Sequence, residues 1–460
     1  MRPIALLLAS AAIIAYASNF LLHVEGDAAP NILTAASWVA QGNADLDEFV
    51  GRVPFDVQYV GGHAYPYTPP GVAVLTVIPV GLAIAAGADV ASLEFVALFG
   101  KVAGVAAAGL SVAFVFLACA LVARPRAALL ATVGYAFGTT VWSISAQQIW
   151  MHGPAQLFVA LGAYLLLRGR GSTRAGFALG FAALIRPVEA FVAALGILRA
   201  RRGGYALRYV LWGFPAAAFL ATYYVLAFGG PRQSYAGLTW SLPPPGWLGL
   251  LVSPSRGLFV YSPFLVFGVA GFAMAWRARD ESARTVRDLS LATFAIYATY
   301  ALFDGWFGGW AYGPRYLGDA LPLLTLGTAF AFDRGALRMI ASRVALAATL
   351  AWSVAINFAG AGWYYFFWNG YHWDVTPSID LTSYRVWDWS DPQWWFVVRR
   401  MFEDPGWTLV PAVVGALAAA FLVWRAYARL GLRPAAEHEA GLGLAEGGYL
   451  DPATSLNAHR

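Results

Sequence analysis

Cysteine and charge are both scarce in this sequence. Cys119 is the single cysteine among 460 residues, which rules out an intramolecular disulfide. Asp, Glu, Lys and Arg make up only 12% of the chain, whereas 59% is hydrophobic. A soluble protein cannot enclose that much apolar surface, but a protein that crosses a membrane many times can expose it to lipid. The composition therefore predicts an all-α polytopic membrane protein.

Several common site motifs are also absent. The sequence has no Gly-rich P-loop, no serine nucleophile motif and no zinc-ligand spacing of His, Cys, Asp and Glu. No internal repeat is visible, which counts against a transporter built from inverted repeats. The net charge of +5 resides mostly in short basic clusters between apolar runs, a pattern that indicates membrane topology rather than nucleic-acid binding. We predict no nucleic-acid partner and no protein metal site, and we leave open the use of a divalent cation.

Twelve apolar runs are readable along the chain. They cover residues 3–23, 70–87, 92–122, 127–146, 150–168, 173–199, 206–228, 257–276, 288–303, 314–332, 338–360 and 408–427. The basic clusters between them should share the cytoplasmic side. They do so if 70–87 is an external or re-entrant helix and if 173–199 is two short helices that meet near Arg186, where Pro187 breaks the helix. This arrangement predicts about twelve crossings with both termini in the cytoplasm.

The same topology divides the chain into three regions. Residues 1–335 form a membrane module with juxtamembrane helices in its first external loop. Residues 336–430 add C-terminal transmembrane helices and an aromatic-rich external loop at 361–407. Residues 431–460 are polar and rich in Gly and Ala, which predicts a disordered cytoplasmic tail.

Some arginines lie in segments predicted to be external, against the usual bias of basic residues, and three of them adjoin apolar runs or site motifs. These three are Arg186, Arg256 and Arg315. Anion binding is one reason for such a placement, because a guanidinium group suits bidentate contact with phosphate. Structural roles are the alternative: Arg186 paired with Glu189, Arg315 paired with Asp304 or Asp319, and Arg256 flanking a helix near the headgroups.

Two acids, Glu25 and Asp27, directly follow the first apolar run in the stretch VEGDAAPN. A carboxylate at the membrane surface can take a proton from an acceptor hydroxyl, provided that a cation stabilises the departing anion. The alternative is a carboxylate that interacts with the N-terminus of the helix predicted to start in APNILTAASWVA.

The order of these motifs resembles that of the GT-C membrane glycosyltransferases, among them the protein O-mannosyltransferases and the lipid A aminoarabinose transferase. The similar motifs span about residues 1–335 and are the acid after the first span, YPYTPPG, QQIWMHGP, LGFAALIRP, RGLFVYSP and GGWAYGPRYL. The stretch GDAAPNILTAASWVAQGNADLDEF looks closest to uncharacterised bacterial members.

The resemblance implies a GT-C-like bundle in a bacterial inner (plasma) membrane, with an active site on the periplasmic or extracellular side. It implies an inverting glycosyltransferase that moves a sugar from a polyprenyl-phosphate donor to a hydroxyl of a lipid, glycan or protein. By position Asp27 is the general base. Glu25 is a possible substitute, because many relatives have adjacent Asp-Glu where this chain has Glu-Gly-Asp. The expected donor-phosphate ligands are Arg186, Arg256, Arg315 and His63. The expected substrate-binding residues are Tyr65, Tyr67, Gln148, His152, Glu189, Tyr261, Asp304, Tyr316 and His372.

Two other functions are open at this stage. A transporter or lipid flippase needs charges near the bilayer midplane, and Lys101 and Glu94 are the candidates. An O-antigen-ligase-like glycan transferase or polymerase would not depend on a single carboxylate base. Membrane lipids are expected partners in every case.

Overall fold

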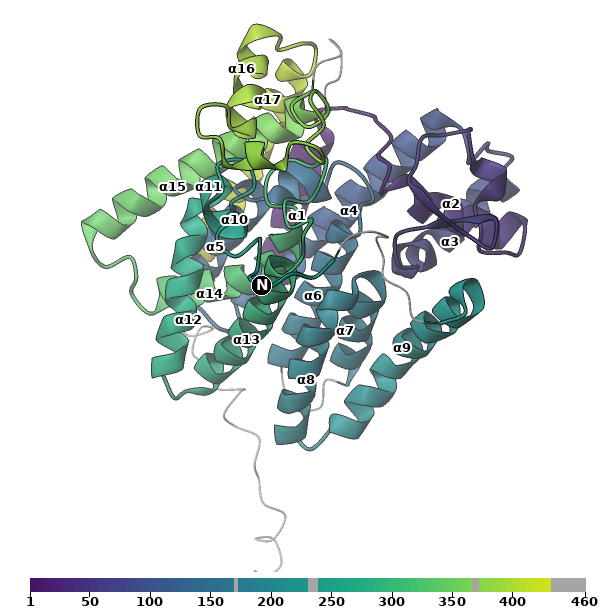
Figure 1. Cartoon of the computed structure of the whole chain (residues 1–460). Coiled ribbons are helices and arrows are strands. Elements are labelled where there is room, and N and C mark those ends of the chain that lie inside the picture. Colours follow the sequence, from purple (N-terminus) through teal and green to yellow (C-terminus); the bar gives the residue numbers. More distant parts are fainter. Residues whose placement is uncertain (169–172, 231–238, 366–371, 432–460) are drawn as a thin grey trace, which may run out of the picture.

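The computed structural model describes residues 1–168, 173–230, 239–365 and 372–431, and their regular structure is almost entirely helical (Figure 1). The helices are α1 Arg2–Ala17, α2 Ala29–Ala40, α3 Gly71–Ala85, α4 Leu93–Cys119, α5 Pro125–Phe137, α6 His152–Leu167, α7 Arg174–Ile185, α8 Ala190–Arg202, α9 Ala206–Phe228, α10 Gly249–Val252, α11 Leu258–Tyr261, α12 Val266–Arg277, α13 Glu281–Ala301, α14 Leu321–Asp333, α15 Ile340–Ala359, α16 Gln393–Glu403 and α17 Leu409–Gly431. The predicted tail lies outside the described residues except for its first position.

The predicted apolar runs fold as helices, as they must where lipid offers the backbone no hydrogen-bond partner. Among the described residues, four helical segments are long and apolar enough to cross a membrane: α4, α9, Ile340–Tyr364 and α17. Several other apolar helices, such as α1 and α6, have only 10–17 residues. The helical character of the membrane protein is thus confirmed, while the count of about twelve crossings stays a prediction.

The run at 173–199 breaks where the sequence predicts. Helix α7 ends at Ile185, and α8 begins at Ala190 after a short 3₁₀ turn. Near the end of α8, Arg199 Nε donates to the Leu166 carbonyl at the end of α6, at 2.8 Å. The two helices therefore form a hairpin whose open end lies beside the C-terminus of α6, and Arg186 lies at its closed end.

Ion pairs tie several basic clusters to one face of the bundle. Arg124 contacts Asp333 at 2.7 Å, and Arg334 contacts Asp280 at 2.7 Å. Two further pairs join α8 to α13 at the same end, Arg199–Glu281 at 2.9 Å and Arg202–Asp288 at 2.5 Å. We call the face defined by Arg124, Arg199, Arg202 and Arg334 the basic face. It lies at the lower end of the bundle in Figure 1.

The first loop forms a lobe beside the bundle, made of α2, α3 and two short strands (Figure 1). The predicted juxtamembrane helices are α2 and α3, which pack against each other. The strands β1 (Val57–Val60) and β2 (His63–Pro66) form an antiparallel hairpin, which corrects the purely helical prediction. Gly61 and Gly62 both have positive φ and supply the two-residue turn that such a hairpin needs.

The lobe packs against the bundle at α9 and at α7. The end of α9 reaches it through ring contacts, including Tyr65 with Phe228 at 5.1 Å. At the start of α3, a Cβ on Gly71 would lie 2.5 Å from the backbone nitrogen of Ile185, so only glycine permits this approach to α7. The last residue of the YPYTPPG motif thus packs against Ile185, which directly precedes Arg186.

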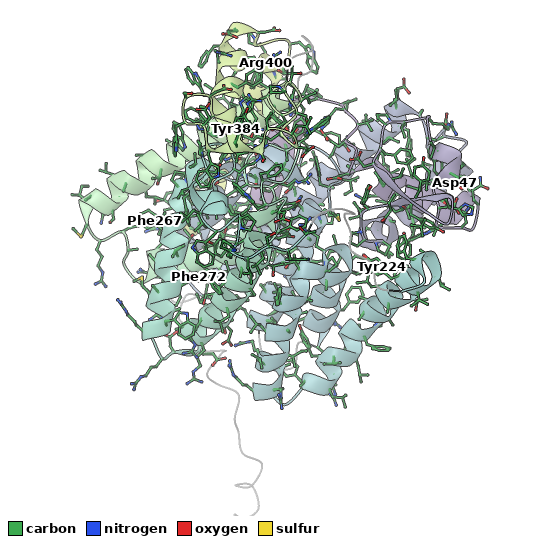
Figure 2. All side chains as sticks on the ribbon, viewed as in Figure 1. Asp47, Tyr224, Phe267, Phe272, Tyr384 and Arg400 are labelled. Atoms are coloured by element: carbon green, nitrogen blue, oxygen red, sulfur yellow. The ribbon has the colours of Figure 1, made fainter. Side chains whose placement is uncertain are left out.

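Residues 372–408 form a cap at the end of the bundle opposite the basic face (Figure 1). The cap contains α16 and carries Tyr384 and Arg400, whereas Asp47 lies in the lobe (Figure 2). Helix α17 then returns along α1. The candidate site lies where the lobe meets the bundle, at the closed end of the α7–α8 hairpin, as the contacts below show.

Candidate active site

A cavity of about 350 Å³ gathers side chains from segments far apart in the sequence. Asp27 comes from the loop before α2, Arg186 from the break between α7 and α8, and Arg315 from the loop before α14. The other lining residues are Pro69, Trp150, Met151, His152, Pro187, Val188, Phe191, Trp240, Thr299, Tyr300, Phe303 and Tyr316. The walls are mainly apolar, so the few charged groups act in a poorly hydrated space.

Arg315 is paired with Asp27. Its Nη1 lies 2.8 Å from Asp27 Oδ2, and both side chains are largely buried. The guanidinium also lies over two rings, 5.3 Å from the centroid of Trp150 and 5.4 Å from that of Tyr316. The alternative of a pair with Asp304 or Asp319 is therefore wrong for this structure, since its carboxylate partner is the candidate base itself.

Arg186 is paired with Asp319, so the structural alternative of a salt bridge with Glu189 is wrong for this structure. Arg186 Nε lies 2.6 Å from Asp319 Oδ2, and Arg186 also donates to the Tyr300 hydroxyl. The same carboxylate contacts His152 Nδ1 at 3.1 Å and accepts from Tyr300 at 3.3 Å. Asp319 is fully buried, so these contacts hold a charge that would otherwise be costly.

Stacked rings connect the two arginines. Tyr300 and Tyr316 lie parallel, with centroids 4.7 Å apart and 2° between their planes. Arg186 lies over the Tyr300 ring at 5.7 Å. Together with Arg315 over Tyr316, the contacts follow the order Asp27, Arg315, Tyr316, Tyr300, Arg186, Asp319. We call this set the arginine–tyrosine ladder.

Further acids surround Asp27. Burial, followed by repulsion from Asp27, raises the pKa of Asp56 above its usual value. A Cβ on Gly26 would lie 2.7 Å from Asp56 Oδ2, so the glycine of Glu-Gly-Asp leaves room for this third acid. Glu25 contacts His23, with 3.3 Å between Glu25 Oε1 and His23 Nε2. Of the two candidate bases, Asp27 alone lines the cavity.

Arg256 is not part of the cavity. It is 1% exposed and donates to three backbone carbonyls, to Gln393 at 2.6 Å and to Asp374 at 2.6 Å. Two other predicted site residues surround the same enclosed cluster. Tyr261 contacts Gln393 at 3.2 Å, and His372 Nε2 lies 2.9 Å from the Tyr364 carbonyl.

The other predicted residues lie around the cavity or away from it. His152 and Tyr316 line the cavity. Glu189 is fully buried, and its carboxylate accepts no hydrogen bond among the described residues. Gln148 donates to the Ala97 carbonyl at 3.1 Å. Away from the lining are Tyr65 and Tyr67 in and after β2, and Asp304, which is hydrogen-bonded to Thr239.

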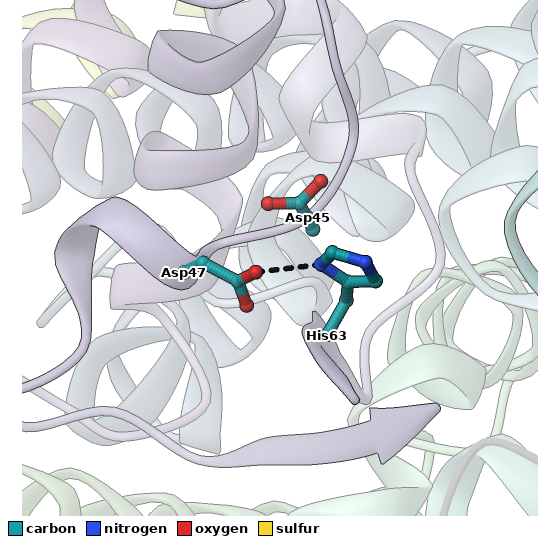
Figure 3. A group of neighbouring side chains, drawn as sticks. All are labelled: Asp45, Asp47 and His63. Carbon is teal, nitrogen blue, oxygen red and sulfur yellow. Dashed lines mark hydrogen bonds and ion pairs between the residues drawn. The ribbon is translucent and has the colours of Figure 1, made fainter. Parts of the chain in front are cut away.

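His63 lies in a separate group on the lobe, with Asp45 and Asp47 (Figure 3). Its Nδ1 lies 2.7 Å from Asp47 Oδ2, and one ligand atom of each residue lies within 4.8 Å of the others. The Ala64 amide and His63 lower the pKa of Asp47, and Asp47 raises the pKa of His63. These groups are of the kind that bind a metal ion, but they are mostly exposed and contact each other instead of the cavity.

Two residues of the ladder, Tyr300 and Asp319, and the adjoining Trp150 were not predicted as site residues. Trp150 and Asp319 flank predicted ones, inside QQIWMHGP and four positions after Arg315. Their proximity to the motifs is a usable signal. Tyr300 lies at the end of an apolar helix and carries no local signal.

Comparison with known proteins gives distant similarities only. No protein-family model and no curated protein matches the sequence. The structure is similar to that of ArnT from Cupriavidus metallidurans bound to undecaprenyl phosphate, with 15% identity and a TM-score of 0.48, over 91% of this chain and 75% of that chain. The apo state of the same protein gives 14% identity and a TM-score of 0.47 over the same shares.

A third similar structure is the Archaeoglobus fulgidus oligosaccharyltransferase tethered to an acceptor peptide with the NVT sequon. It has 14% identity and a TM-score of 0.43, over 78% of this chain and 53% of that chain. ArnT and the oligosaccharyltransferase both belong to the GT-C superfamily, which the sequence motifs also resemble. The similarities are too distant to assign an activity, so a function has to be argued from the cavity itself.

Proposed function

We propose that this protein is an inverting glycosyltransferase that moves a sugar from a polyprenyl-phosphate donor to a hydroxyl acceptor. One observation carries the proposal. Asp27, Arg186 and Arg315, which are distant in sequence, line a single largely apolar cavity. A carboxylate beside arginines is the combination that a transfer from a phosphate donor requires, with a base for the hydroxyl and cations for the departing phosphate.

The surroundings of the cavity suit a lipid-linked donor. Phe191 and Trp240 line the cavity and are also well exposed, so an apolar chain can enter from the side. Pro69 lines it too and leads directly into α3, whose Ile78 and Leu82 are exposed. In our proposal α3 forms one wall of the groove for the prenyl chain.

We further propose that the basic face is cytoplasmic and that the cavity opens on the external side of the plasma membrane. The support is the clustering of arginines on the basic face, since Lys and Arg prefer the cytoplasm. Single cysteines in a Cys119→Ala background test it with a membrane-impermeant thiol reagent. Exposed positions 43 and 390 should be labelled from outside, and positions 201 and 284 should not. External labelling at 201 or 284 would refute this orientation.

The proposed activity is tested with purified protein and a panel of polyprenyl-phosphate sugars. Wild-type protein should release polyprenyl phosphate, detected by mass spectrometry, when a hydroxyl acceptor is present. Asp27→Asn should not do so at a comparable rate. Intact donors throughout a broad panel of sugars and acceptors would count against the proposal.

A lipid-linked substrate could instead be moved across the membrane, and one observation favours this second candidate. Lys101 is buried within α4 and donates to Gln147 at 2.7 Å, and it forms no salt bridge with a carboxylate of the described residues. Ionisable groups at membrane depth commonly mark transport pathways. Transport predicts movement of an intact substrate across vesicle membranes, lost in Lys101→Met, without any release of polyprenyl phosphate.

A further inference from the structure

The two arginines of the arginine–tyrosine ladder have different carboxylate partners. Arg315 contacts the candidate base directly, at 2.8 Å from Asp27. Arg186 lies beyond the stacked Tyr316 and Tyr300 rings and is held by a different carboxylate, Asp319. Both arginines line the same cavity, but the ring pair stands between them in the order of contacts.

An inverting displacement places the base and the leaving group on opposite faces of the sugar. The acceptor oxygen attacks the anomeric carbon from one side, and the phosphate leaves from the other. Inverting glycosidases illustrate the space needed, because their two carboxyl groups are about 6.5–9.5 Å apart across the sugar and the attacking water. A cation that touches the base is on the acceptor side, and the phosphate needs a cation on the far side.

We propose that Arg186 binds the leaving phosphate and that Arg315 positions Asp27 beside the acceptor hydroxyl. This assignment rests on the proposed function. The sequence assigns donor-phosphate binding to the arginines together, whereas here only Arg186 has that role. Tyr300 and Tyr316 act as the spacer between the two sides. Asp319 is a positioning residue that orients Arg186 and His152 without contacting the substrate.

The contacts of Asp319 support its part in this assignment. Its two oxygens contact Arg186 at 2.6 Å, His152 at 3.1 Å and Tyr300 at 3.3 Å, so one buried carboxylate fixes three cavity side chains. A guanidinium carries five N–H donors in a rigid fork, so it can contact a carboxylate on one edge and an anion on another. Arg186 therefore need not leave Asp319 in order to bind phosphate.

The reaction balances with these groups alone. The acceptor oxygen forms a bond to the anomeric carbon while the bond between that carbon and the phosphate oxygen breaks. The electron pair of the broken bond stays on the phosphate, next to Arg186. The hydroxyl proton passes to the Asp27 carboxylate, and the sugar is transferred with inversion.

Direct binding of polyprenyl phosphate, without sugar, separates the two arginines. Purified protein in nanodiscs is titrated with the lipid, with matched variants Arg186→Gln and Arg315→Gln. Arg186→Gln should weaken binding by about 30-fold or more, as expected for the loss of a desolvated charge contact. Arg315→Gln should bind within about threefold of wild type, yet its turnover should fall strongly because Asp27 is displaced. Equal loss of binding in both variants would overturn the assignment.

Two further variants guard against a trivial loss of folding. Arg186→Gln/Asp319→Asn removes both charges of the buried pair and should still bind polyprenyl phosphate weakly at a near-normal melting temperature. Tyr300→Phe keeps the ring stack but removes the hydroxyl that contacts Arg186 and Asp319. It should raise KM for the donor more than it lowers kcat, a split that a merely structural role does not produce. A fall in kcat alone would refute the placement of Arg186 on the donor side.

The same experiments distinguish failure of the assignment from failure of the proposed function. If wild-type protein releases phosphate from no donor and binds no polyprenyl phosphate, the glycosyltransferase proposal falls. If wild type is active and Arg315 proves to be the phosphate ligand, only the division between the arginines falls. Competition by inorganic phosphate measures how much of the binding comes from the phosphate group and how much from the prenyl chain.

Discussion

The protein contains two buried arginine–carboxylate clusters that look alike in sequence and differ in structure. Around Arg256, backbone carbonyls, Gln393 and Asp374 accept hydrogen bonds from all three guanidinium nitrogens, and Arg256 does not line the cavity described above. Arg186 and Arg315 have carboxylate partners of similar closeness, but they line a cavity and stack on rings. A buried arginine thus becomes a candidate ligand through the space beside it, and not through its burial or its pairing.

The largest effect is expected at the candidate base. Asp27→Asn keeps the size of the side chain but cannot accept a proton, so turnover per folded molecule should fall by about 10²–10⁴-fold. Glu25→Gln is the matched control, because Glu25 faces His23 and does not line the cavity. Steady-state release of polyprenyl phosphate measures both. A larger loss at Glu25 would move the base to that residue.

Substitution of Arg256 should reduce stability rather than turnover. Arg256→Ala leaves the fully buried Asp374 without its cation, and breaking such a pair typically costs about 3–5 kcal/mol of stability. Thermal unfolding in detergent measures the loss, and activity should fall only in proportion to the folded fraction. Arg399→Ala is the control, since its pair with Glu403 is exposed and is worth about 1 kcal/mol or less. If Arg256→Ala were stable but no longer bound the donor, Arg256 would be a site residue like Arg186 and Arg315, and the proposed difference between the two clusters would be wrong.

The contact between the lobe and α7 gives an intermediate effect. Gly71→Ala inserts a methyl group against the Ile185 backbone and should cost about 1–3 kcal/mol through overpacking. Because Pro69 and Arg186 adjoin this contact, KM for the donor should also rise. Gly81→Ala is the control, as its Cβ would lie 3.5 Å or more from the nearest atom. Equal behaviour of the two variants would show that the approach at Gly71 is adaptable.

The exposed pair on the lobe should give the smallest effect. Asp47 raises the pKa of His63 above 6.5, so this part of the stability is lost as the pH rises through the folded-state pKa. His63 and the Ala64 amide lower the pKa of Asp47 below 3.8, so its part is lost as the pH falls through that pKa. His63→Gln should therefore reduce stability most between about pH 4 and 6.5, and only slightly, because both side chains of the pair are exposed to solvent. Unfolding curves of wild type and His63→Gln at several pH values test this window. A stability difference that does not change with pH would show that the His63–Asp47 pair is not its cause.

The sequence predicts the helices and the break at Arg186 well, because apolar runs and proline act locally. It also predicts that Asp27, His152, Arg186, Arg315 and Tyr316 belong together, because their segments share the predicted external side. The same reasoning wrongly adds Arg256 and His63, which do not line the cavity. The sequence does not predict the pairing of these segments. Arg186 pairs with Asp319 rather than with Glu189. The pairing depends on how the 3₁₀ turn Tyr316–Ala320 packs against α6 and α13, and not on spacing along the chain.

The hairpin in the first loop and the enclosure of Arg256 were missed for related reasons. The alternation in β1 and β2 extends over only four residues each, too few to separate from loop sequence. The carbonyls around Arg256 come from residues 255, 307 and 309, and backbone carbonyls carry no signature in the sequence. Only the folded positions of the loops show whether every N–H donor of an arginine has an acceptor within the protein.

The hairpin of α7 and α8 has a consequence for the bilayer around the protein. With 12 and 13 residues, its arms are about 18–20 Å long, while the hydrocarbon core of a membrane is about 30 Å thick. A short apolar element is accommodated by thinning of the adjacent lipid, at a cost of a fraction of a kcal/mol per Å. We expect the leaflet beside this hairpin to be depressed, so that lipid headgroups sink toward the closed end at Arg186. Local thinning of the bilayer would then bring the phosphate group of a lipid-linked donor to the level of the Arg186 guanidinium.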